Sequence, residues 1–214
     1  MKYEYLLFDL DGTITDSGSG ILNAVRYALE FYGIKETDDA KLNRFIGPPL
    51  KRSFMELYGF DEKKAMDAIM KYREYYGEKG IFENEVYEGI RELLKKLTEQ
   101  GYKPVLATSK PEMFTFKIME HFELDKYFCF MAGATANEKR TEKYEVIEYA
   151  LSCAKADKAK SIMIGDRKHD IEGAIKNGID SIGVLYGYGS ESELKKAGAT
   201  YIVKDVEELS KFFL

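Results

Sequence analysis

Short apolar runs alternate along this chain with longer segments in which apolar residues recur every three or four positions. The apolar runs predict β-strands over residues 5–8, 104–107, 128–132, 161–164 and 181–186. Helical periodicity separates most of these strands, at residues 91–97, 143–154 and 170–177. Alternating strands and helices predict an α/β fold with a doubly wound, Rossmann-like parallel sheet.

One connection is much longer than an ordinary crossover between strands. About ninety residues separate the first predicted strand from the second. Most of this insertion is predicted to be helical, at residues 21–32, near Leu42, at 50–58 and at 62–76. We therefore predict a Rossmann-like core domain of residues 1–15 and 83–214. A smaller α-helical cap domain is inserted at residues 16–82, where a lid would sit.

Two carboxylates follow the first predicted strand directly, in the stretch Asp9-Leu10-Asp11-Gly12-Thr13. Open α/β sheets place their chemistry at the carboxyl ends of strands. Gly12 indicates a turn, which lets both carboxyl groups converge on one ligand. Such a pair suits Mg²⁺, which takes oxygen ligands, and makes phosphoryl transfer the first chemistry to test. The alternative is an ordinary turn in which each aspartate bonds its own backbone.

Polar residues also follow the second predicted strand. Thr108 is placed to donate a hydrogen bond to a phosphoryl oxygen, or else to cap the next helix. Ser109 and Lys110 share this ambiguity.

A second acidic turn follows the strand at 161–164. Asp166 is a natural further metal ligand, and Asp170 either ligates the metal, directly or through water, or caps the helix at 171–177. We expect His169 to be an exposed loop residue and His121 to lie on a helix surface. With only two histidines, a histidine-rich transition-metal site is not expected.

The acidic residues need a counter-charge. Lys143 opens a predicted helix from which its ammonium can reach back to the acidic cluster and to a substrate phosphate. Lys139 and Arg140 are nearby competitors for this role, and most lysines are solvated surface residues.

The composition of the chain narrows the range of binding partners to expect. The formal net charge of -5 gives no global reason to bind nucleic acid or an anionic membrane, so a small soluble substrate is expected, with the chain acting as a monomer or homodimer. Cys129 and Cys153 have no metal-type spacing and predict two free thiols in a reducing compartment. No signal peptide or transmembrane run is apparent, so a cytoplasmic location is expected.

Taken together, the acidic turn, hydroxyl, lysine and second acidic turn resemble the four motifs of the haloacid dehalogenase superfamily of phosphohydrolases. The resemblance covers essentially the whole chain. Within the superfamily, the chain is similar to the phosphoglycolate phosphatase-like subgroup, which carries a helical C1-type cap. The stretches 86–89 and 183–189 also look like that subgroup. In many relatives a proline follows the motif lysine, whereas Tyr144 follows Lys143 here.

The resemblance implies a Mg²⁺-dependent phosphatase acting on a small phosphomonoester such as phosphoglycolate, a nucleoside monophosphate or a sugar phosphate. Asp9 would be the nucleophile that forms an aspartyl-phosphate, and Asp11 the general acid and base. The implied metal ligands are Asp9, Asp11 through its backbone carbonyl, Asp166 and Asp170. The implied contacts to the phosphoryl oxygens are Thr108, Lys143, Ser109, Gly12 and Thr13.

The predicted cap should select the substrate, because the residues of the core contact only the phosphate and the metal. Arg44 and Lys51 flank the turn at residues 45–49 and are the best candidates to contact an anionic leaving group. The alternative is that both are solvated surface residues.

Four other protein classes use related residues. A sugar phosphomutase of the same superfamily would use the same Asp9 and Asp11. A phospho-acceptor receiver domain, which is a non-enzymatic switch, resembles a compact single domain with its acceptor on a middle strand. A true dehalogenase would lack the acid/base aspartate represented here by Asp11, and the missing membrane spans argue against a P-type pump.

Overall fold

The computed structural model describes residues 2–135 and 140–214. The chain forms two compact units. Unit 1 comprises Met1–Asp16 together with Val86–Leu214, and unit 2 comprises Ser17–Glu85.

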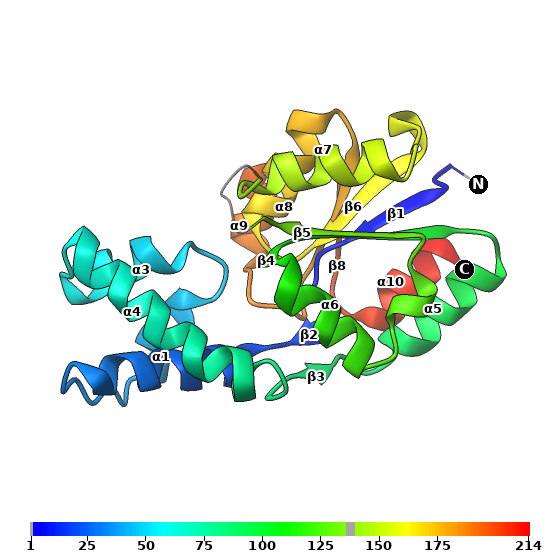
Figure 1. Cartoon of the computed structure of the whole chain (residues 1–214). Coiled ribbons are helices and arrows are strands. Elements are labelled where there is room, and N and C mark those ends of the chain that lie inside the picture. The colour runs from blue at the N-terminus through cyan, green and yellow to red at the C-terminus, as the bar shows by residue number, and fades with distance from the viewer. Residues whose placement is uncertain (1, 136–139) are drawn as a thin grey trace. The chain divides into compact units, whose positions relative to one another are not determined.

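Unit 1 is built on a six-stranded sheet in the order β5-β4-β1-β6-β7-β8, and every neighbouring pair is parallel (Figure 1). In sheet order the strands are β5 (Phe130–Ala134), β4 (Lys103–Pro111), β1 (Tyr5–Phe8), β6 (Ser161–Gly165), β7 (Asp180–Val184) and β8 (Tyr201–Val203). The predicted doubly wound α/β fold is therefore confirmed. The chain runs outward from β1 in both directions, so a topological switch point lies at the carboxyl ends of the central strands.

Helices cover both faces of this sheet. Figure 1 shows α7 (Lys143–Cys153) and α8 (Lys168–Asn177) on one face. The opposite face carries α5 (Ile90–Glu99), α6 (Glu112–His121) and α10 (Val206–Phe213). Side chains alternate along β1, so Leu7 packs in the core with α7 and α8 whereas Leu6 and Phe8 point the other way. All three are fully buried, as expected for a strand covered on both faces.

Unit 2 is helical. Its elements are α1 (Gly18–Phe31), α2 (Asp39–Leu42), the 3₁₀-helix η1 (Asn43–Phe45), α3 (Leu50–Tyr58), α4 (Glu62–Tyr75) and the π-helical turn η2 (Tyr76–Gly80). Buried aromatic rings form much of its core, with Phe54 against both Phe45 and Phe60. The remaining elements of the chain are the short paired strands β2 (Thr15–Asp16) and β3 (Glu85–Val86), the 3₁₀-helices η3 (Asp125–Tyr127) and η4 (Lys158–Lys160), and α9 (Glu191–Ala197).

Several predicted boundaries are wrong. The strand expected at 128–132 lies at Phe130–Ala134, the one expected at 181–186 ends at Val184, and β8 was not predicted at all. Because α8 begins at Lys168, His169 is a partly buried helical residue rather than an exposed loop residue. Its pKa is lowered because burial disfavours the charged imidazole.

Cys129 and Cys153 are both free and exposed, so the prediction of two free thiols is confirmed. Within residues 2–135 and 140–214, no helix combines the length and the apolar character that crossing a membrane requires.

Candidate active site

The candidate residues of the core meet because β1 and β6 end at nearly the same level, beside the middle of β4. Phe8 of β1 pairs with Leu106 of β4 and Ile164 of β6. The next residue, Asp9, still donates its backbone N–H to the carbonyl of Ile164 at 2.9 Å. Asp9 therefore lies beside the end of β6 and the middle of β4, one step before Asp166 and Thr108.

Asp9 is the buried carboxylate at the centre of the site. The residue is 8% exposed. Its Oδ1 accepts hydrogen bonds from the Leu10 amide at 2.8 Å and contacts the Lys143 ammonium at 2.7 Å. Because Oδ1 is engaged twice, Oδ2 is the oxygen left to react.

Lys143 connects the first acidic turn with the second. It is the first residue of α7, and its Nζ lies 2.7 Å from Asp9 and 2.8 Å from Asp170 and donates to the Ala107 carbonyl at 3.1 Å. These three contacts use every donor of a lysine ammonium. Of its competitors, Arg140 instead pairs with Glu112, and Lys139 lies outside the described residues.

The second acidic turn brings Asp166 and Asp170 to the same place. Carboxylate oxygens of Asp9, Asp166 and Asp170 all lie within 4.8 Å of one another. Two glycines permit this approach. A Cβ at Gly12, whose φ is +78°, would overlap the Asp166 carboxylate, and one at Gly165 would overlap Asp170.

Burial and the closeness of several charges shift the pKa values of this cluster strongly. Burial raises the pKa of Asp9 to about 6, against the pull of Lys143. Burial and then the neighbouring Asp170 and Asp9 raise the pKa of Asp166 well above its ordinary range. Burial opposes the charge on Lys143, but Asp170 and Asp9 outweigh it and raise the pKa of the ammonium. Asp9 is still mostly ionised at neutral pH.

The acidic cluster fits a divalent cation. Asp166 is fully buried and its Oδ1 has no hydrogen-bond partner in the described structure. A buried carboxylate without a partner is costly, and hard cations take such oxygens as ligands. Asp170 differs, because its Oδ2 accepts the Arg167 amide at 3.0 Å while its Oδ1 faces Lys143. It thus also serves the predicted capping role at the start of α8.

We expect the pH dependence of stability to reveal this crowding in metal-free protein. The folded-state pKa of Asp9, about 6, lies above its ordinary 3.8, so the native state takes up a proton that the unfolded state does not. The stability that this proton contributes is fully present below the ordinary pKa of 3.8, and it is lost as the pH rises through the folded-state pKa of about 6. In EDTA, the free energy of unfolding in urea should therefore rise between about pH 7 and about pH 5.

Asp9→Asn is the matched variant for this measurement, because the amide keeps the shape of the side chain and cannot titrate. The stability gain on acidification should be smaller in Asp9→Asn than in the wild type. Equal pH slopes in the two proteins would contradict the crowding described here.

Asp11 and Thr108 complete the core of the site. The Asp11 side chain, which is 23% exposed, forms an ion pair with Lys110. Thr108 is buried and its Oγ1 accepts the Lys110 amide at 3.2 Å, which leaves the hydroxyl hydrogen available to a phosphoryl oxygen. It does not cap the next helix, because α6 begins at Glu112 after Pro111.

The other predicted contacts are more dispersed. Gly12 and Thr13 form the turn after Asp9, where the Gly12 amide donates to the carbonyl of Thr15. Ser109 is exposed at the end of β4. Arg44 and Lys51 belong to unit 2, where Arg44 is exposed on η1 and Lys51 forms an ion pair with Glu62.

Sequence reasoning missed three contacts of the acidic turns. Lys110 pairs with Asp11, the Tyr188 amide donates to Asp166 Oδ2 at 2.7 Å, and the Tyr186 hydroxyl donates to the Thr13 carbonyl at 3.0 Å. The glycine-rich stretch at 183–189 was the available signal for both tyrosines. Gly187 and Gly189 pack against Asp166 so closely that a Cβ at either would overlap it.

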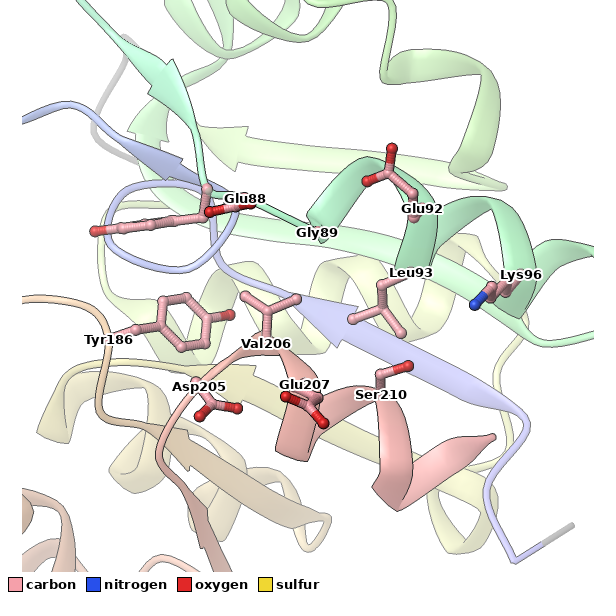
Figure 2. Close-up of a pocket in the computed structure, with 11 residues that line it drawn as sticks. Glu88, Gly89, Glu92, Leu93, Lys96, Tyr186, Asp205, Val206, Glu207 and Ser210 are labelled. Atoms are coloured by element: carbon pink, nitrogen blue, oxygen red, sulfur yellow. The ribbon is translucent and has the colours of Figure 1, made fainter.

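A groove of about 610 Å³ lies elsewhere in unit 1. It runs between α5 and α10, and Figure 2 shows Val206 between Tyr186 and Leu93 on its apolar side. Carboxylates of Glu88, Glu92, Asp205 and Glu207 also line it. None of its lining residues belongs to the acidic cluster, so the chemistry is located by the strand ends and not by this groove.

Comparisons with known proteins agree with this geometry. The model of the haloacid dehalogenase-like hydrolase family matches residues 6–184. A protein named 5'-nucleotidase from Pseudomonas aeruginosa is 44% identical over 209 residues, which is 98% of this chain and 95% of that protein. Tyrosine-protein kinase PtkA from Mycobacterium tuberculosis is 34% identical over 199 residues, or 93% of this chain and 68% of that protein.

A solved structure extends the agreement to three dimensions. The crystal structure of a predicted phosphatase from Clostridium acetobutylicum has a TM-score of 0.93 and 50% identity, covering 99% of this chain and 98% of that one. Its similarity spans both the sheet that carries Asp9 and the helical unit. With the family match over residues 6–184, this establishes that the chain belongs to the haloacid dehalogenase-like hydrolase family.

Proposed function

We propose that this chain is a Mg²⁺-dependent phosphatase that hydrolyses small phosphomonoesters through an aspartyl-phosphate on Asp9. The observation that carries the proposal is the buried cluster of Asp9, Lys143, Asp166 and Asp170 at the carboxyl ends of β1 and β6. Nucleoside monophosphates are the first substrates to test, because the 44% identical relative is named 5'-nucleotidase. Phosphoglycolate and sugar phosphates are the other two classes.

Asp9 Oδ2 attacks phosphorus, since Oδ1 is held by Leu10 and Lys143. The Asp9–phosphorus bond forms while the bond to the alcohol oxygen breaks, and Asp11, which enters this step protonated, gives its proton to that oxygen. In the second half-reaction a water oxygen bonds to phosphorus, the bond to Asp9 breaks, and a proton of the water passes to Asp11. Thr108 would donate to a phosphoryl oxygen throughout. Lys143, whose three donors are engaged by Asp9, Asp170 and the Ala107 carbonyl, would exchange one of these contacts for another phosphoryl oxygen.

Asp9, Asp166 and the backbone carbonyl of Asp11 would hold the metal, with Asp170 farther out because Lys143 and Arg167 already engage it. When bound, Mg²⁺ neutralises negative charge on the phosphoryl oxygens. The cation also supplies the counter-charge that Asp166 lacks among the described residues.

Unit 2 is proposed to be the inserted cap, which selects among substrates. The contact of Arg44 and Lys51 with an anionic leaving group stays a prediction. Testing it requires Arg44→Met and Lys51→Met, scored on substrates that differ in the charge of the leaving group.

We expect phosphate release from at least one of these three classes of phosphomonoester, and loss of that release in EDTA. Asp166→Asn should raise the Mg²⁺ concentration for half-maximal activity by at least about tenfold, because a metal ligand has been neutralised. The control is Asp157→Asn, an exposed aspartate before η4. Full activity in EDTA, or an unchanged Mg²⁺ requirement in Asp166→Asn, would contradict the metal assignment.

The rival transfer reactions give different products. A phosphomutase would return the phosphoryl group to a sugar, and its turnover would depend on a bisphosphate activator. The relative named tyrosine-protein kinase suggests a further acceptor, a protein tyrosine. Inorganic phosphate released without any activator or acceptor protein favours hydrolysis over both.

A further inference from the structure

We propose that Lys110 is a positioning residue that holds the Asp11 carboxylate where it can meet first the leaving oxygen and then the attacking water. The inference rests on the phosphatase function proposed above and adds a residue to its machinery. It gives each of the two motif aspartates a lysine of its own, Lys143 for Asp9 and Lys110 for Asp11.

The Lys110 ammonium contacts both carboxylate oxygens of Asp11. The Lys110 ammonium lies 2.6 Å from Asp11 Oδ2 and 2.8 Å from Oδ1. The Lys110 side chain is only 5% exposed, whereas that of Asp11 is 23% exposed. Exposed ion pairs contribute little, but a lysine buried to this degree requires a partner. The pair is therefore a built feature of the site and differs from the surface ion pairs of this chain.

The backbone of β4 delivers Lys110 in a fixed place. The pairing of β4 with β5 shifts register between Ala107 and Pro111. Within this irregular stretch Ser109 is exposed while Lys110 is buried. The Lys110 amide donates to Thr108 Oγ1 at 3.2 Å, and its carbonyl accepts the Thr115 hydroxyl at 3.2 Å. Both backbone polar groups of Lys110 are therefore held by hydrogen bonds, which fixes the position from which its side chain extends.

Asp11 needs such an anchor more than Asp9 does. Asp9 is buried and held by Leu10 and Lys143, but Asp11 lies in a turn and is partly open to solvent. A partly exposed side chain samples several staggered rotamers. A group that must transfer protons in two successive steps works best when it stays in one place, because small displacements are costly. The ammonium restricts Asp11 through both of its oxygens.

Lys110→Met tests the proposal, with Lys117→Met, an exposed lysine on α6, as the matched control. On a nucleoside monophosphate, kcat should fall by at least about tenfold while KM changes less than about twofold. On p-nitrophenyl phosphate, whose leaving group needs no proton, nitrophenol should appear in a fast burst followed by slow turnover. Lys117→Met should behave as the wild type.

A double-mutant cycle with Asp11→Asn makes the test decisive. If Lys110 acts through Asp11, adding Lys110→Met to Asp11→Asn lowers kcat by less than about twofold further. Multiplying losses, or a raised KM with unchanged kcat, would overturn the positioning role and make Lys110 an independent substrate contact. Wild-type protein that releases no phosphate would overturn the proposed function, and the positioning role with it. The mutant outcomes above, in an active wild-type protein, would overturn the positioning role alone, so the two failures are distinguishable.

Discussion

Asp9→Asn should lower phosphatase turnover by at least about a thousandfold, because it removes the atom that attacks phosphorus. An amide oxygen is a poor nucleophile, and the Lys143 contact to Oδ1 does not compensate for the lost charge. The measurement is steady-state phosphate release at saturating substrate and Mg²⁺.

Asp125→Asn serves as the control, because Asp125 is an exposed aspartate at the start of η3. It should keep full activity. Melting curves of both variants separate loss of chemistry from loss of fold. Turnover of Asp9→Asn within about tenfold of the wild type would exclude Asp9 as the nucleophile.

Lys143→Met should cause the largest loss of stability, about 3–5 kcal/mol in metal-free protein, together with loss of activity. The substitution keeps an unbranched side chain of similar length but leaves Asp9 and Asp170 without their cation. The measurement is the free energy of unfolding in urea with EDTA. Mg²⁺ should recover part of the stability, because it binds only the folded arrangement of carboxylates.

Lys117→Met is again the control, and it should change stability by less than about 0.5 kcal/mol as a surface substitution. A Lys143→Met protein as stable as the wild type in EDTA would show that the carboxylates of Asp9 and Asp170 do not depend on this ammonium.

The sequence predicted the central part of the fold well, for a local reason. The apolar run over Tyr5–Phe8 is a buried strand that ends directly before the two aspartates, and both features are read from neighbouring residues. Lys143 likewise opens its helix as predicted. The family resemblance drawn from these motifs is confirmed by the match over residues 6–184.

What could not be predicted depends on contacts between distant parts of the chain. Thr108, Ser109 and Lys110 follow an apolar run and look like a loop, yet β4 continues through them because it pairs with β5. The sequence indicated for Lys110 only a phosphoryl contact or a helix cap, because its partner Asp11 lies 99 residues away. The edge strand β8 has only three residues, too few for a recognisable pattern.

Trapping the intermediate tests the central claim most directly. Wild-type protein is mixed with substrate and Mg²⁺, quenched in acid at short times and treated with borohydride, which reduces an acyl phosphate of aspartate to homoserine. The account predicts homoserine at position 9 in the wild type and none in Asp9→Asn. Turnover without any phosphorylated carboxylate, or homoserine at Asp11 or Asp166 instead, would contradict it.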